Sequence, residues 1–131
     1  MDNKKRSRRE VREDIIKTLY QMDIHQEFVY EKTSYPFYNE SLQGIIDTLT
    51  TIDETIQQNL QKWKINRLSF VDRAIIRFAT YEMIETNTPH EIIINEALNI
   101  TRKYSDEGDS KMVGFTNRVL DNISKSLKKV G

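Results

Sequence analysis

Apolar residues recur at three- and four-residue steps along most of the chain, and this spacing is typical of helices with one apolar face. Only two prolines and four glycines interrupt the pattern. The N-terminal and C-terminal stripes consist of Val11, Ile15, Leu19 and Met22, and of Phe115, Val119, Ile123 and Leu127, respectively. The pattern predicts an all-α protein of about six or seven helices.

The sharpest helical pattern begins near residue 69. Its apolar stripe consists of Val71, Ile75, Phe78 and Ala79, with Arg73 and Arg77 displaced from it. Ser69 and Asp72 have the spacing of a capping box, so the helix is expected to begin near Ser69. It is expected to end before Thr88-Pro89, because proline lacks the amide that continues a helix but suits the start of a new one.

A second stripe repeats at seven-residue steps through Leu42, Leu49, Ile56 and Trp63. We expect one long amphipathic helix over residues 42–63. It should pack within the chain rather than in a coiled coil, because the stripe is widened and lacks complementary flanking charges. Gly44 costs this helix about 1 kcal/mol and is expected to allow close approach of another helix. The aromatic-rich residues 27–40 are expected to form a short helix or turn over the core.

The composition sets limits on function. With 131 residues the chain suits one small domain and has no room for an additional catalytic domain. It has no cysteine, no pair of histidines at metal-binding spacing and no glycine-rich phosphate loop. We therefore expect no disulfide, metal site, cofactor or catalytic activity. No apolar segment follows the basic start, so no signal peptide or membrane span is expected, and a cytoplasmic location follows.

Charge is unevenly distributed, although the formal net charge is zero. The cations within residues 1–12 are Lys4, Lys5, Arg6, Arg8, Arg9 and Arg12. From residue 18 to residue 62, by contrast, acids outnumber lysines and arginines. A segregated positive segment favours contact with phosphate, and the alternative is a solvated, frayed N-terminus. Phosphate binding is the better supported of the two, because the last arginines of this segment directly adjoin the first apolar stripe. They should therefore lie on a folded helix.

Four strings carry a resemblance to a known family. They are RREVREDIIKTLYQMD near the N-terminus, the stretch 42–63, DRAIIRFATYEM followed by P-x-x-x-x-INEA, and FTNRVLDNI near the C-terminus. Their order and separation resemble the NusB family of bacterial transcription antitermination factors over nearly the whole chain. The sequence departs from the family pattern at Arg118, where glycine is usual, and in a longer segment between Tyr104 and Phe115.

The resemblance implies a single NusB-like domain over residues 1–131, divided into helical bundles at 1–64 and 65–131. It also implies binding rather than catalysis. Family members recognise the boxA element of nascent RNA and pair with NusE, which is also a small-subunit ribosomal protein. In this way they act on the RNA polymerase elongation complex in ribosomal RNA operons. No cofactor and no membrane contact are implied.

The basic arm and the family's motif positions supply candidate contacts. The candidates for RNA are Lys4, Lys5, Arg6, Arg8, Arg9, Arg12, Tyr20, Asp72 and Arg73, and those for the protein partner are Glu82, Asn117 and Asp121. Arginine supplies phosphate contacts and a planar group for stacking, and an aromatic ring suits a splayed base. Phe78 is expected in the core and Glu82 on the surface. The alternative for each polar candidate at a motif position is an ordinary surface residue or an intrahelical pair.

Two other functions stay open at this point. The chain could be an accessory RNA-binding domain associated with an RNA methyltransferase, since NusB-like domains also occur fused to such enzymes. It could also be a helical protein-interaction adaptor that does not bind RNA. A neighbouring methyltransferase reading frame would favour the first, and lack of RNA affinity in the presence of the ribosomal partner would favour the second.

Overall fold

The computed structural model describes residues 6–106, 108 and 110–130, and within them all regular structure is helical. The helices are α1 (Arg8–His25), α2 (Pro36–Asp47), α3 (Leu49–Gln58), the short 3-10 helix η1 (Ile65–Arg67), α4 (Phe70–Glu85), α5 (His90–Tyr104) and α6 (Lys111–Val130). This confirms the predicted all-α class. The described residues include no helix long and apolar enough to cross a membrane.

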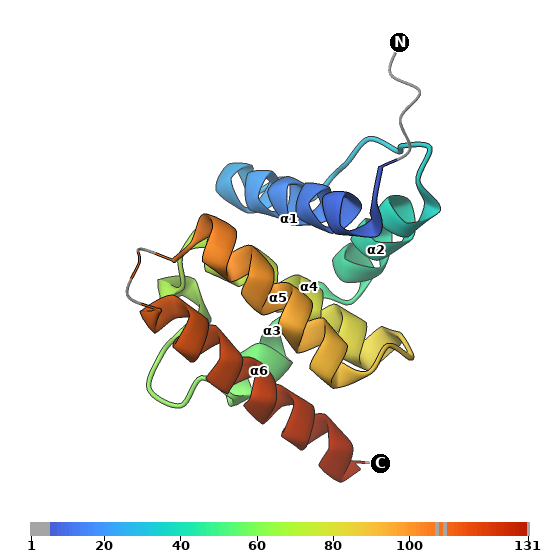
Figure 1. Ribbon diagram of the computed structural model, residues 1–131. Coiled ribbons are helices and arrows are strands. Elements are labelled where there is room, and N and C mark those ends of the chain that lie inside the picture. Colours follow the sequence, from blue (N-terminus) through green and yellow to red (C-terminus); the bar gives the residue numbers. More distant parts are fainter. Residues whose placement is uncertain (1–5, 107, 109, 131) are drawn as a thin grey trace.

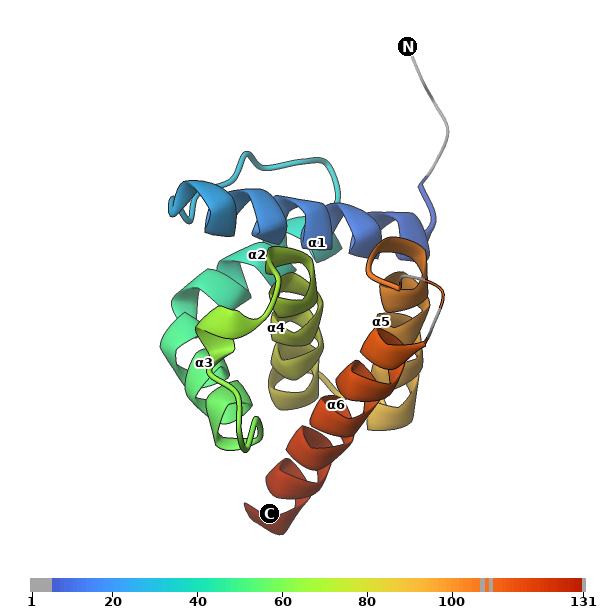
Figure 2. The same ribbon diagram turned by 90° about the vertical axis from the view of Figure 1, so that its left-hand side faces the viewer.

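Helix α4 is the centre of the molecule and packs against each of the other five α-helices. Figures 1 and 2 show α1 on one side of the α4 and α5 pair and α6 on the other. Most of α4 is buried, including Ile75, Ile76 and Phe78. A helix covered on all sides must bury its polar residues as well, and this determines the environment of several predicted site residues.

Local sequence signals set the ends of α4 as predicted. The Ser69 hydroxyl accepts a hydrogen bond from the Asp72 amide at 3.1 Å and donates to the Asp72 carboxylate at 2.7 Å. At the other end, the Thr86 hydroxyl donates to the Glu82 carbonyl at 2.7 Å. The next helix, α5, begins directly after Pro89.

The predicted long helix over residues 42–63 is wrong. Its first part belongs to α2, which ends at Asp47, and its second part is α3, which ends at Gln58. At the break, the Thr48 hydroxyl donates back to the Gly44 carbonyl at 2.7 Å, a contact that bends helices. The bend lets the stripe follow α4, so Leu42, Ile45, Ile52 and Ile56 are all buried. Trp63 lies beyond α3 with 55% of its surface exposed.

The close approach predicted at Gly44 is confirmed. A β-carbon at this position would lie 2.4 Å from the Tyr81 hydroxyl oxygen, well inside van der Waals contact. Glycine therefore allows the Tyr81 ring of α4 to lie directly against α2. Burial there raises the pKa of the Tyr81 hydroxyl, and the charge of nearby Glu85 adds to the effect.

Buried apolar residues from both halves of the chain form one cluster, which includes Val11, Leu42, Ile75 and Ile123. The division into bundles 1–64 and 65–131 stays a prediction. The basic start of α1 and the end of α6 lie on opposite sides of the molecule (Figures 1 and 2). Lys125 and Lys128, near the end of α6, consequently do not extend the basic surface at the start of α1.

Candidate nucleic-acid interface

The arginine-rich segment lies at a well-capped helix start. The Ser7 hydroxyl accepts from the Glu10 amide at 3.1 Å, and the Glu10 carboxylate accepts from the Ser7 amide at 2.9 Å. This reciprocal capping box fixes the first turn of α1. Arg8, Arg9 and Arg12 therefore lie on a folded helix, as predicted. Lys4 and Lys5 lie outside the described residues.

Two exposed arginines of this segment make ion pairs. The Arg6 guanidinium lies 2.7 Å from the Asp14 carboxylate, and that of Arg9 lies 3.7 Å from the Glu96 carboxylate. The Arg6 pair contributes about 0 to 1 kcal/mol, because water screens both charges. In the Arg9 pair Glu96 is partly buried, but the separation is long and the arginine is exposed, so this pair also holds the guanidinium weakly. Either arginine can therefore exchange its carboxylate for a phosphate at little cost.

Arg8 is held in a different way. Its guanidinium carbon lies 3.6 Å from the centre of the Phe37 ring, which is the geometry of a cation–π stack. Phe37 belongs to α2 and packs in turn against the core ring of Phe78, with 6.2 Å between the ring centres. The exposed Arg8 side chain thus rests on a platform that is fixed to the hydrophobic core.

Tyr20 is half-buried and faces Phe70 at the start of α4, with ring centres 6.4 Å apart in an edge-to-face arrangement. The Phe70 ring is 41% exposed, and the Arg73 guanidinium carbon lies 4.8 Å from its centre. Phe70 was missed as a candidate because nothing in the sequence distinguishes an exposed phenylalanine at the start of a helix from a core one. Exposed aromatic rings near cations suit unpaired bases.

The expectation that Glu82 lies on the surface is wrong, because only 2% of this residue is exposed. Its carboxylate accepts two hydrogen bonds from the guanidinium of Arg12, and the one between Nη2 and Oε2 is 2.7 Å long. Arg12 is also buried, so the two charges satisfy each other between α1 and α4. The binding roles assigned to both residues stay predictions, although neither charge faces solvent.

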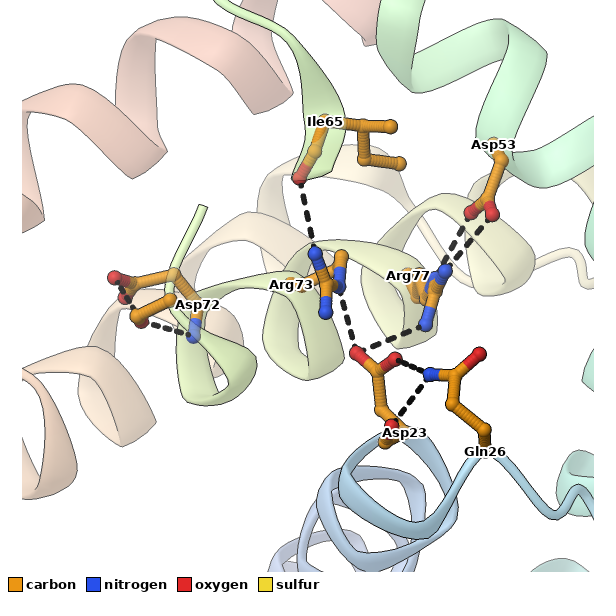
Figure 3. A network of polar contacts seen from close by, with 8 residues as sticks. Asp23, Gln26, Asp53, Ile65, Asp72, Arg73 and Arg77 are labelled. Carbon is orange, nitrogen blue, oxygen red and sulfur yellow. Dashed lines mark hydrogen bonds and ion pairs between the residues drawn. The ribbon is translucent and has the colours of Figure 1, made fainter. Parts of the chain in front are cut away.

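Arg73 and Arg77 are also buried, and Figure 3 shows the network that they form. Arg73 Nε donates to Asp23 at 2.6 Å, and Arg77 makes two bonds of 2.8 and 2.9 Å to Asp53. Asp23 also lies 3.3 Å from Arg77, so this one carboxylate serves two arginines. The displacement of these arginines from the apolar stripe therefore does not bring them to the surface.

Asp72 is buried at the start of α4, where it accepts hydrogen bonds from Ser69 and, at 2.6 Å, from the Ser105 hydroxyl. Its predicted contact with RNA, like that of Arg73, stays a prediction. Both side chains have internal partners that hold the N-terminal end of α4 against its neighbours.

The two candidate partner residues lie on α6, which is on the other side of the α4 and α5 pair from α1 (Figures 1 and 2). Asn117 is exposed, and Asp121 is partly exposed and forms an ion pair with Lys125 at 3.0 Å. The described residues contain no group of three or more His, Cys, Asp or Glu side chains that could hold a metal ion.

Comparison with known proteins identifies the family. The model of the NusB family matches residues 5–125. The chain is 40% identical over 131 residues to "Transcription antitermination protein NusB" of Bacillus thuringiensis (strain Al Hakam) and of Bacillus cereus (strain B4264), covering 92% of this chain and 98% of each relative. These relatives are transcription factors and not enzymes.

Solved structures show the same fold. "T. maritima NusB, P3121, Form 2" superposes with a TM-score of 0.79 at 33% identity, covering 93% of each chain. A chain in "Crystal Structure of a Plectonemic RNA Supercoil" has a TM-score of 0.81 at 22% identity, covering 97% of this chain and 100% of that one. With a family match over most of its length, the chain belongs to the NusB family of transcription antitermination proteins.

Proposed function

We propose that this protein binds boxA-type single-stranded RNA through the N-terminal part of α1 and does so together with a NusE-type ribosomal protein. The pair would then support elongation by RNA polymerase through ribosomal RNA operons. The observation that carries the proposal is the set of solvent-facing arginines, Arg6, Arg8 and Arg9, at the capped start of α1. Their charges add to the positive end of the helix dipole.

Three features support RNA as the ligand. The exposed arginines are held by weak ion pairs or by stacking, so they can turn to phosphates without loss of the fold. Tyr20 lies further along α1 and, with Phe70 at the start of α4, offers an aromatic edge to bases. A structure with this fold is also described as that of an RNA supercoil.

The need for a second protein follows from charge. The chain is net neutral, and its described basic surface at α1 is short. Few phosphate contacts give weak binding at physiological salt, so a basic partner should strengthen it. Asn117 and Asp121 on α6 are the proposed partner contacts, and of the two Asn117 is the more accessible.

Equilibrium titration of labelled boxA-like RNA tests the proposal, with this protein alone and with the NusE-type protein at fixed salt. We expect measurable binding that the partner strengthens, and weaker binding to a scrambled RNA of equal length. Equal affinity for both RNAs would argue against boxA recognition. No affinity in either condition would favour a helical adaptor that does not bind RNA.

A further inference from the structure

A polar and aromatic cluster lies where the end of α5 meets the middle of α1. The Tyr104 hydroxyl donates to the Glu13 carboxylate at 2.6 Å, and the Lys103 ammonium donates to the same oxygen at 2.9 Å. Tyr104 is the last residue of α5, and 40% of its surface is exposed. One end of the ring is therefore anchored while much of the side chain remains open to solvent.

Two cations accompany the ring. The Lys17 and Lys103 ammonium nitrogens lie 5.7 and 5.3 Å from the centre of the Tyr104 ring. Although burial raises the pKa of Glu13, the hydrogen bonds from Lys103 and Tyr104 and the charges of both lysines lower it overall. Glu13 is thus ionised at neutral pH. Two lysines against one glutamate leave a surplus positive charge beside an exposed aromatic ring.

The cluster continues the proposed RNA surface. Arg9, Glu13 and Lys17 follow one another at four-residue steps on α1, and Tyr20 comes three residues later. Residues at these spacings share one face of a helix. From Arg9 to Tyr20 the helix rises by about 16 Å. Tyr104 therefore lies beside the part of α1 that separates the arginines from the pair of Tyr20 and Phe70.

We propose that Tyr104 is a stacking platform for one base of single-stranded RNA, with Lys17 and Lys103 binding the adjoining phosphates. This inference rests on the proposed function and extends its surface along α1 and onto α5. Base stacking on aromatic rings flanked by cations is the common mode of single-strand recognition. An apolar protein segment fits the cluster less well, because charged groups surround the ring.

Tyr104→Leu and Tyr104→Phe form a matched pair for the test. Both lose the hydrogen bond to Glu13, but only the first loses the ring. A role that depends only on the hydrogen bond to Glu13 would therefore affect both variants equally. Stacking predicts that Tyr104→Leu weakens RNA binding by about 5- to 150-fold, while Tyr104→Phe retains most of the affinity.

Photocrosslinking supplies a readout that depends on direct contact. RNA carrying 5-iodouridine should crosslink to the peptide that contains Tyr104, and the crosslink should be absent in Tyr104→Leu. Lys125→Ala on α6 is the control variant and should leave both affinity and crosslink unchanged.

Each outcome of this experiment has a defined meaning. If the wild-type protein binds RNA and Tyr104→Leu binds it with the same affinity, the stacking site is overturned and the proposed function stands. Equal losses in the leucine and phenylalanine variants would also overturn it, because they would assign the effect to the hydroxyl rather than to the ring. Absence of wild-type binding even with the NusE-type protein would overturn both proposals.

Discussion

Arg12 of α1 and Glu82 of α4 lie 70 positions apart in the chain, yet their side chains meet in two parallel hydrogen bonds inside the protein. The pair connects the helix that carries the basic surface to the central helix of the fold. An ion pair in this position fixes how α1 sits on α4 and so fixes the direction in which the neighbouring arginines point.

We expect Glu82→Ala to lower the free energy of unfolding by about 3 to 5 kcal/mol, because it leaves the Arg12 guanidinium buried without a counter-charge. Urea denaturation measures this change. Glu85→Ala, at an exposed position one turn away, is the control and should change stability by less than about 0.5 kcal/mol. The double variant Arg12→Met, Glu82→Leu should recover much of the loss. A Glu82→Ala protein with the same free energy of unfolding as wild type would contradict this account of the pair.

The ion pair between Glu13 and Lys103 predicts a pH dependence of stability. The pKa of Glu13 is lowered from its usual 4.5, so the contribution of its carboxylate is present above that value and is lost as pH falls through the folded pKa. The pKa of Lys103 is raised above 10.5, mainly by its hydrogen bond to Glu13, so its contribution is lost only as pH rises through that higher value.

Glu13→Gln should therefore be less stable than wild type near neutral pH and should approach wild-type stability as the pH falls below the folded pKa of Glu13. Unfolding by urea at several pH values measures the difference between the two proteins. A difference that stays constant from neutral to acid pH would show that the Glu13 charge does not contribute.

The stack of Arg8 on Phe37 predicts energetic coupling in RNA binding. Phe37→Leu should weaken binding by removing the platform that orients the Arg8 guanidinium. In an Arg8→Ala background the same substitution should have little further effect, since no guanidinium is left to orient. A double-mutant cycle of RNA affinities tests this. Equal effects of Phe37→Leu in both backgrounds would mean that the ring does not act through Arg8.

Binding of RNA and of the NusE-type protein should be mutually cooperative. If the partner strengthens RNA binding tenfold, about 1.4 kcal/mol, RNA must strengthen partner binding by the same factor. Titration of RNA with and without the partner, and of the partner with and without RNA, measures the two factors. Equal RNA affinity for the free protein and the heterodimer would exclude cooperativity while leaving RNA binding in place.

The features that the sequence predicted correctly depend on neighbouring residues. The start of α4 follows from the short-range contact of Ser69 with Asp72, and the folded arginines of α1 follow from the apolar stripe behind them. The break at Thr48 was missed because it depends on the path of α2 and α3 around α4. The regular spacing of apolar residues continues through such a bend, so the spacing alone does not reveal it.

The site was less predictable than the fold for a related reason. Arg73 and Asp23 are 50 positions apart, so no local pattern identifies them as partners. One signal was present, however. The charged residues of α4 are interspersed among apolar residues, so the helix has no wholly polar face to turn to solvent. A helix without such a face is expected to be buried on all sides. That signal indicates internal partners for Arg73, Arg77 and Glu82 rather than surface roles.

The salt dependence of RNA binding tests the central claim most directly, by comparing wild type with the variant Arg6→Ala, Arg8→Ala, Arg9→Ala. Each lost phosphate contact lowers the slope of log affinity against log salt by roughly 0.7 for single-stranded RNA. We predict weaker binding and a slope reduced by up to about 2 in a variant that keeps its helical fold. Unchanged affinity and slope in the folded variant would contradict RNA binding through the start of α1.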